Sequence, residues 1–148
     1  MELVHTALEN SASHLPQIRI PVERQILAKR RWRGVAEDGH EFGFDLETPL
    51  RDGAAVWQNE TALYVIAQKY EPVLEVRSSE LGVRSSDAAR LGWMIGNLHF
   101  QIEIADDIIR VVDDPAVRQM FEREHIAFAA CKRVFHPISG AHSHGHAH

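Results

Sequence analysis

The chain has 148 residues, of which 45% are hydrophobic and 25% charged, and its formal net charge is −5. This composition is typical of a soluble globular protein, and no apolar run approaches the ~20 residues of a transmembrane helix. No secretory signal is evident, and the single cysteine excludes an intramolecular disulfide framework. We therefore expect a cytoplasmic protein without a membrane partner. The acidic net charge argues against a nucleic-acid partner.

Residues 1–72 are predicted to form a small all-β domain. Polar and apolar residues alternate over residues 41–46, as in a half-buried strand, and turn signals such as Asp38-Gly39 and Asp52-Gly53 recur about every 8–12 residues. Short strands at this spacing favour a sandwich or a barrel. The basic run at residues 29–33 is interpreted as a solvated strand that protects a sheet edge. A docking patch for an acidic partner stays open as the alternative.

Residues 73–135 show a different pattern, which predicts the order strand, helix, strand, strand, helix, strand. Apolar residues recur on one helical face between Leu91 and Leu98, and Asp114-Pro115 is typical of a helix start. The predicted strands are 73–76, 100–104, 108–112 and 126–134, and the predicted helices are 87–97 and 115–125. This order is the split βαβ, or ferredoxin-like, arrangement. The predicted fold class is therefore α+β.

Residues 136–148 form a third segment, a tail dominated by Pro, Ser, Gly, Ala and His. The tail has too little apolar surface to offset its ordering entropy, so we expect it to be disordered. Four of its histidines alternate with small residues: His142, His144, His146 and His148. Four imidazoles on a flexible chain can wrap one metal ion. A purification tag and a solvated tail without a role are the alternatives.

Outside this alternating run, His99 is the strongest candidate metal ligand, because it follows a predicted helix at a helix-to-strand junction. One histidine per chain cannot hold a metal ion firmly, but a twofold axis would place two copies of His99 side by side. His136, at the start of the tail, is an auxiliary candidate. His125 is interpreted as a residue that interacts with a helix dipole and Cys131 as a small core residue, with a metal role as the alternative for each. Three further histidines are expected at the surface: His5, His14 and His40.

The remaining polar motifs do not favour an enzyme. The paired carboxylates at 106–107 and 113–114 are interpreted as a turn and a helix cap, and the sequence contains no GxGxxG, GxxxxGK[ST], HExxH or CxxC motif. A metalloenzyme would need fixed ligands, an open coordination position and a general base. No convincing base accompanies His99, so we expect no catalysis.

Several short motifs carry a family resemblance. The first half contains Gly39-His40-Glu41-Phe42-Gly43 and Leu50-Arg51-Asp52-Gly53, and the second contains Gly96-Asn97-x-His99 and Phe135-x-Pro137 before the tail. On these residues the chain resembles, over nearly its whole length, the UreE urease accessory proteins, which are nickel metallochaperones. It departs from them in two places. Residues 111–115 lack the histidines of a peripheral site, and Leu98 stands where a basic residue is common.

The resemblance implies a β domain similar to the peptide-binding domain of Hsp40-type chaperones, followed by a ferredoxin-like metal-binding domain. It also implies a head-to-head homodimer with Ni²⁺ at the interface, bound by His99 and supplemented by histidines of the tail. The implied partners are the urease accessory GTPase and, through it, apo-urease with its accessory proteins. We expect delivery of Ni²⁺ for assembly of the urease metallocentre. The alternative is nickel or zinc buffering without delivery, and Cu²⁺ would also bind such a site in vitro.

Overall fold

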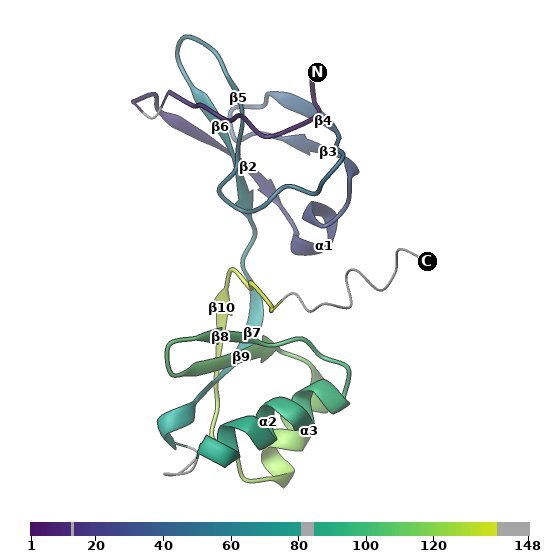
Figure 1. The fold of residues 1–148 in the computed structure, drawn as a ribbon, viewed down its shortest axis with the longest axis vertical. Coiled ribbons are helices and arrows are strands. Elements are labelled where there is room, and N and C mark those ends of the chain that lie inside the picture. The colour runs from purple at the N-terminus through teal and green to yellow at the C-terminus, as the bar shows by residue number, and fades with distance from the viewer. Residues whose placement is uncertain (13, 81–84, 139–148) are drawn as a thin grey trace. The chain divides into compact units, whose positions relative to one another are not determined.

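The computed structural model describes residues 1–12, 14–80 and 85–138 and divides into two compact units, Met1–Lys69 and Tyr70–His148 (Figure 1). We call them unit 1 and unit 2 and describe each by itself. The chain is a mixed α and β protein. The sequence placed the domain boundary between residues 72 and 73, and the two units meet between residues 69 and 70. Within the described ranges, no helix has the length and apolar character needed to cross a membrane.

The described part of unit 1 contains two three-stranded sheets. The first has the order β1 (Glu2–Val4), β4 (Glu41–Asp45), β3 (Arg31–Val35), and the second has the order β2 (Gln17–Val22), β6 (Leu63–Gln68), β5 (Ala55–Gln58). The pairs β1–β4 and β2–β6 are parallel, and β3–β4 and β5–β6 are antiparallel. Strands and turns were the only elements expected here. A one-turn helix, α1 (Arg24–Leu27), was missed because four residues are too few to display a helical period.

Apolar side chains from both sheets form the core of unit 1. Ile20 and Phe42 are fully buried, and the rings of Trp32 and Phe44 stack with their centroids 3.9 Å apart. Gly34, two residues after Trp32 on β3, leaves room for the Trp32 ring, since a Cβ at that position would lie 2.9 Å from that ring. The strand predicted at residues 41–46 is present as β4, but its three central residues, Phe42, Gly43 and Phe44, are all buried, so burial does not alternate as the sequence pattern indicated.

His40 lies against an aromatic cluster and keeps 32% of its side chain exposed, so it is a partly covered surface residue rather than a freely solvated one. Its ring centroid is 5.1 Å from those of Phe42 and Trp57 and 5.2 Å from that of Tyr64. Tyr64 Oη donates a 2.6 Å hydrogen bond to Asp38 Oδ2. That hydrogen bond, together with burial, raises the pKa of Tyr64 to about 12. The turn before β4 folds the imidazole onto the rings, which a pattern of single residues does not reveal.

Unit 2 contains one four-stranded sheet in its described part. Its elements follow in the order β7 (Glu71–Arg77), the 3-10 helix η1 (Ser78–Glu80), α2 (Ser85–Asn97), β8 (Glu103–Ala105), β9 (Ile108–Val112), α3 (Pro115–Arg123) and β10 (Ala129–Arg133). The strand order is β10-β7-β9-β8, and all neighbours are antiparallel. Strands β10 and β8 are therefore the two edges. Both are shorter than the strands predicted at 126–134 and 100–104, because capped turns after α3 and α2 occupy the first residues of those ranges.

Helices α2 and α3 pack on the same face of this sheet (Figure 1). Leu74 of β7, Ile95 of α2 and Phe121 of α3 are fully buried there. The start of α3 agrees with the sequence prediction: Asp114 Oδ1 accepts a 2.8 Å hydrogen bond from the amide of Ala116, and a proline follows the cap. The opposite face of the sheet carries no described helix and is where charged side chains collect.

Candidate metal centre

His99 follows α2 in a backbone conformation that residues other than glycine seldom adopt. Its φ is +65°. The amide of His99 donates to the carbonyl of Gly96 (2.9 Å), and the amide of Phe100 donates to the carbonyl of Ile95 (3.3 Å). Together these bonds form the Schellman motif, which satisfies the last carbonyls of a helix and places a left-handed residue at the C′ position. His99 is that residue.

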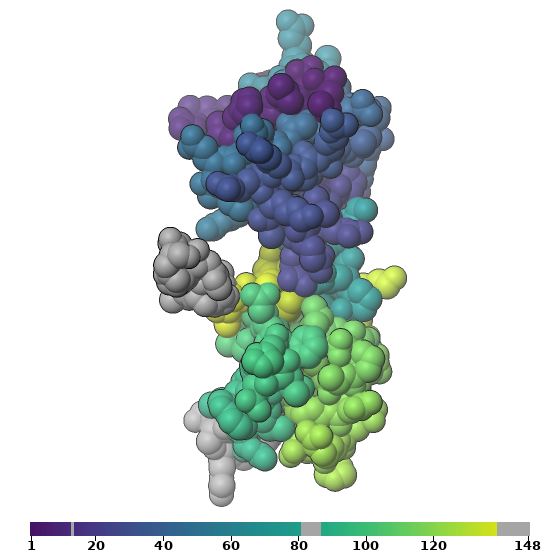
Figure 2. Space-filling view, turned by 90° about the vertical axis from the view of Figure 1, so that its right-hand side faces the viewer, coloured from purple at the N-terminus to yellow at the C-terminus, as the bar shows by residue number. Residues whose placement is uncertain are grey.

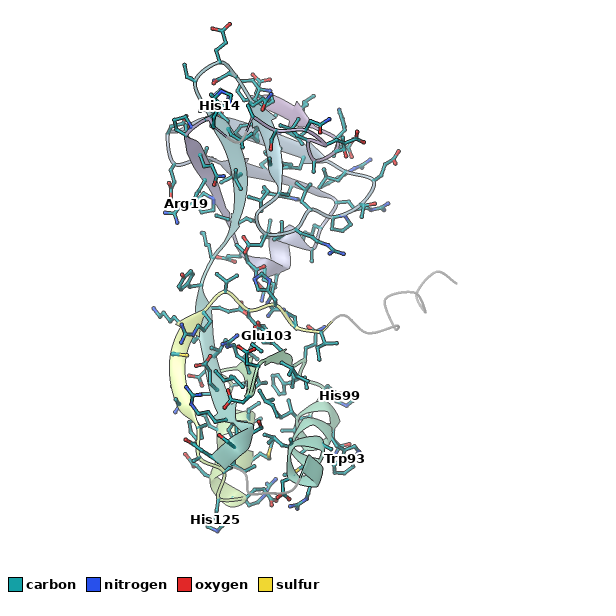
Figure 3. All side chains as sticks on the ribbon, turned by 60° about the vertical axis from the view of Figure 1, so that its left-hand side comes forward. His14, Arg19, Trp93, His99, Glu103 and His125 are labelled. Atoms are coloured by element: carbon teal, nitrogen blue, oxygen red, sulfur yellow. The ribbon has the colours of Figure 1, made fainter. Side chains whose placement is uncertain are left out.

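A histidine at C′ costs stability. The left-handed backbone brings the Cβ of any residue except glycine close to the following carbonyl, at a cost of about 1–2 kcal/mol. Strained residues of this kind cluster at functional sites. His99 is exposed, and Figure 3 shows it at the end of α2. The cap holds the backbone in place, so the imidazole is presented to solvent from a rigid support.

His125 occupies the same position after α3. Its φ is +55°, and the amide of Ile126 donates to the carbonyl of Phe121 (2.8 Å) while its own amide donates to that of Glu122 (3.3 Å). The side chain is exposed and lies well away from His99 at the bottom of unit 2 in Figure 3. Two histidines with one backbone geometry thus lie in different surroundings, which makes His125 a natural control for His99.

Exposed apolar side chains accompany His99. Trp93 of α2 is 68% exposed and Leu98 is 37% exposed. Figure 3 shows Trp93 and His99 on the same side of unit 2, and Figure 2 shows that α2, in teal-green, forms part of the molecular surface. Ile104, on the edge strand β8, is 59% exposed. Grouped apolar side chains on a surface mark interaction sites.

Residues 134–138, which we call the strap, connect β10 to the neighbourhood of β8. Phe135 is 1% exposed. The amide of His136 donates to Glu103 Oε1 (3.0 Å) and the amide of Ile138 donates to the carbonyl of Ile102 (2.7 Å). The strap therefore leaves the sheet at the β10 edge and ends beside the opposite edge. Ile102, which accepts its last hydrogen bond, lies three residues after His99 along the chain.

Glu103 also belongs to an ion cluster on the sheet face away from the helices. Its Oε2 lies 3.1 Å from Arg110 Nη1, and Arg110 Nε donates to Glu75 Oε2 (2.6 Å). The side chains of Glu75, Glu103 and Arg110 are between 10% and 14% exposed. Burial by itself favours the neutral acid, yet the hydrogen bonds from Arg110 and from the Cys131 thiol hold the pKa of Glu75 below its ordinary value.

Cys131, on β10, keeps its proton. Burial, followed by its hydrogen bond to the Glu75 carboxylate, raises the pKa of the thiol. A metal-binding cysteine must be a thiolate, so this position does not favour the metal role that was left open for it. The interpretation as a small packing residue agrees with its half-buried side chain.

The predicted metal ligands are described only in part. His99 and His136 are both exposed. The other four predicted ligands lie outside the described residues: His142, His144, His146 and His148. Across the ranges that the structure describes, no group of three or more His, Cys, Asp and Glu side chains is close enough to hold a metal ion.

The other polar motifs have structural partners. Asp113 forms a two-pronged ion pair with Arg118 (2.6 and 2.8 Å), which holds the pKa of the Asp113 carboxyl below its ordinary value, and residues 106–107 form the turn between β8 and β9. In the basic run, Arg31 Nε donates to Asp45 Oδ1 across the strand pair (2.8 Å). Glu103 was not identified from the sequence, because its role depends on which strands become neighbours.

Comparison with known proteins identifies the family. Residues 71–148, more than half of the chain, match the model of the family described as UreE urease accessory protein, C-terminal domain. The chain is 23% identical over 151 aligned residues to the urease accessory protein UreE 2 of Pseudomonas syringae pv. tomato, with 100% of this chain and 87% of that protein covered. It is 27% identical over 135 residues to UreE of Cupriavidus pinatubonensis, with 90% and 58% covered. This chain belongs to the UreE family of urease accessory proteins.

Proposed function

We propose that this chain is a homodimeric nickel chaperone, which binds Ni²⁺ between two copies of unit 2 and delivers it for assembly of the urease metallocentre. The observation that carries the proposal is the exposed imidazole of His99, held at a strained helix cap. Imidazole nitrogen is a suitable ligand for Ni²⁺. The positive φ of His99 costs stability, and the same helix cap holds its imidazole, a potential metal ligand, on a rigid backbone.

The dimer follows from the number of ligands. One His99 cannot hold the ion alone, and a twofold contact would bring a second His99 beside it. Trp93 and Leu98 supply exposed apolar surface on the same helix and its end, which is the surface that a contact between two copies would bury. The ion would then lie on the twofold axis between two rigidly presented imidazoles.

The tail supplies the remaining ligands in this proposal. The strap ends at Ile138, which is hydrogen-bonded to Ile102. His142 is four residues further on, and four residues span at most ~14 Å. His142, His144, His146 and His148, with His136 as an auxiliary ligand, can therefore complete the coordination. An ion held by two rigid and several detachable ligands can be released in steps, as delivery requires.

The wider assignment rests on the family and on the strand order of unit 2. We infer that unit 2 is a ferredoxin-like domain, since its elements and sheet order follow that arrangement, and that unit 1 is an Hsp40-like peptide-binding domain. The proposed partners are the urease accessory GTPase and the complex of apo-urease with its accessory proteins. The protein acts in the cytoplasm and performs no catalysis of its own.

The test is a calorimetric Ni²⁺ titration joined to sedimentation of the same samples. We expect one high-affinity ion per dimer in the wild-type protein, loss of that ion in His99→Gly, and retention of it in His125→Gly. A His99→Gly protein that binds its first ion as tightly as the wild type would refute the interface site. Transfer of the bound ion to the purified GTPase distinguishes a chaperone from a nickel or zinc buffer, because a buffer needs no docking partner.

A further inference from the structure

We propose that unit 1 carries a docking groove for a carboxylate-rich, extended segment of another protein, at the sheet edge where β1 and β4 end and β3 begins. An acidic partner is the alternative that the sequence left open for the basic run at residues 29–33. This role rests on the peptide-binding function proposed above for unit 1 and adds the chemistry of the ligand. It does not depend on the nickel site of unit 2.

The strand pairing brings three segments of the chain to one edge of the first sheet. Strands β1 and β4 are parallel, so both leave the sheet at the same edge, and β3 begins there because it is antiparallel to β4. Two hydrogen bonds hold the segments together at this edge. His5 Nδ1 donates to the carbonyl of Asp45 (3.0 Å), and the amide of Leu46 donates to the carbonyl of Arg30 (2.9 Å). The backbone of the edge is therefore fixed.

An open groove of about 780 Å³ lies between these segments. It is lined by residues 5–7 after β1, residues 30–31 at the start of β3 and residues 45–50 at the end of β4 and after it. A second hollow, lined by residues 29–31 and 45–46, adjoins the groove through the lining residues that the two share. Sites for ligands have volumes of about 300–1,000 Å³. The groove is therefore large enough to receive part of a peptide.

Arginines without ion pairs collect beside this groove. Most arginines in the described ranges have a carboxylate at ion-pair distance. Within the same ranges, no carboxylate pairs with Arg30, Arg33 or Arg51. Arg30 lines the groove, Arg33 lies on β3, and Arg51 directly follows the last lining residue. A chain with a net charge of −5 thus presents uncompensated cations at one edge of unit 1.

The charges of the groove favour a peptide as the occupant. A guanidinium group binds a carboxylate through two parallel hydrogen bonds, and clusters of arginine recognise acidic motifs. Arg31 is already paired with Asp45, so Arg30 is the guanidinium available inside the groove. Glu47 also lines it and would repel a nucleic acid, which carries a phosphate on every unit. A peptide can place an uncharged residue opposite Glu47.

The probe for this groove is a fluorescent peptide in which glutamate alternates with alanine. Its counterpart with glutamine in place of glutamate is the ligand control. Fluorescence anisotropy of each peptide, titrated with the full chain, measures the affinity. We expect the glutamate peptide to bind, and to bind less tightly as salt is added, because exposed charges are screened. Equal affinity for the two peptides would overturn the proposal.

Two substitutions test the groove in different ways. Arg30→Glu should weaken binding of the glutamate peptide about tenfold, through loss of a charge-assisted contact. Lys132→Glu is the matched control, because it changes the net charge equally at an exposed position of unit 2, and it should bind as the wild type. Thr48→Trp places a large ring at an exposed lining residue without changing the charge, and it should also weaken binding.

Three outcomes contradict the groove. If Lys132→Glu loses as much affinity as Arg30→Glu, the attraction follows net charge alone. If Thr48→Trp binds the peptide as the wild type does, the arginines act without the groove. If a single-stranded thymidine oligonucleotide binds more tightly than the peptide, with the same loss in Arg30→Glu, the ligand is a phosphate chain. Each of these results would overturn the proposal.

A Ni²⁺ titration of Arg30→Glu separates the groove from the nickel site. We expect this variant to keep the wild-type nickel affinity while it loses the peptide. Loss of both would mean general structural damage and would overturn the groove. A glutamate peptide that fails to bind leaves the nickel proposal standing, whereas a His99→Gly protein with wild-type nickel affinity refutes the interface site and leaves the groove standing.

Discussion

The strain at His99 and His125 allows ligand loss to be separated from fold loss. Both residues have positive φ at a Schellman cap, where glycine is favoured. We expect His99→Gly and His125→Gly each to stabilise unit 2 by about 1 kcal/mol, since each relieves the same backbone strain. In a domain of this size that corresponds to a rise in Tm of about 4–8 °C. Thermal unfolding followed by circular dichroism measures it.

Alanine provides the control for the cap substitutions. His99→Ala removes the imidazole and keeps a Cβ in the left-handed conformation, so its Tm should stay near that of the wild type. If glycine and alanine at position 99 give the same Tm, the strain assigned to this cap is absent. A His99→Gly protein that is more stable and yet loses nickel cannot be dismissed as misfolded.

The Tyr64–Asp38 pair predicts an alkaline limit for unit 1. Because the pKa of Tyr64 is raised to about 12 in the folded protein, against an ordinary value of about 10, its contribution to stability is complete below pH 10 and is lost as the pH rises toward 12. Urea unfolding across this range should show the wild type losing stability more steeply than Tyr64→Phe. Parallel curves for the two proteins would contradict the assignment.

At the residue scale, the sequence predicted the place of His99 after a helix, whereas the surroundings of several other side chains could not be predicted. His99 was identified because it follows a helical period and a Gly-Asn pair. The cluster around His40 and the contacts of Glu103 were not predicted, since they join residues far apart in the chain: His40 and Trp57 are 17 positions apart, and Glu103 and His136 are 33 positions apart. Residue spacing relates only neighbours within one helical turn or one strand, so it does not predict contacts between residues far apart in the chain.

At the scale of elements, local chemistry set what could be predicted. The start of α3 was found through its Asp-Pro cap, and the period of Leu91 and Ile95 located α2, because caps and periods act within a few residues. The start of β8 was placed three residues early. The residues before Glu103 alternate like a strand. Instead of pairing with a neighbouring strand, Phe100 caps α2 and Ile102 accepts a hydrogen bond from the strap.

The ion cluster on the open sheet face should be essential to unit 2. Arg110→Met leaves the largely buried carboxylate of Glu103 without its cation and Glu75 with only the more exposed Arg133, whose Nε lies 3.4 Å from Glu75 Oε2. We expect a loss of about 3 kcal/mol in the free energy of unfolding. Arg118→Met is the control, because its partner Asp113 lies in a more exposed pair, and a much smaller loss is expected. Chemical denaturation compares the two, and equal losses would count against the cluster.

The same cluster gives unit 2 an acid limit. The pKa of Glu75 is lowered in the fold, so its contribution is present above the ordinary glutamate value of about 4.3 and is lost as the pH falls through the lower folded value. The wild type should therefore lose stability on acidification, whereas Arg110→Met has less to lose. Stability measured from pH 6 downward, with converging curves for the two proteins, is the expected result.

At the scale of the whole molecule, the proposed dimer should be sensitive to charge at Trp93. In Trp93→Glu, a twofold contact would bring two carboxylates together, and we expect a monomer with reduced affinity for its first nickel ion. The fold should survive, since Trp93 is 68% exposed. Tyr70→Glu is the control: Tyr70 is equally exposed, at 70%, and does not belong to α2. Sedimentation that finds Trp93→Glu still dimeric would move the interface elsewhere.

The repeated cap has a consequence for how this sequence would drift under selection. Random substitution followed by selection for heat resistance alone should replace both histidines, because glycine relieves the strain at either helix end. Selection for urease activation in a host should accept glycine at position 125 and reject it at position 99. The fraction of sequenced clones in which His125 is replaced then gives the replacement rate expected without selection for the imidazole. The fraction that keeps histidine at position 99 is compared with it.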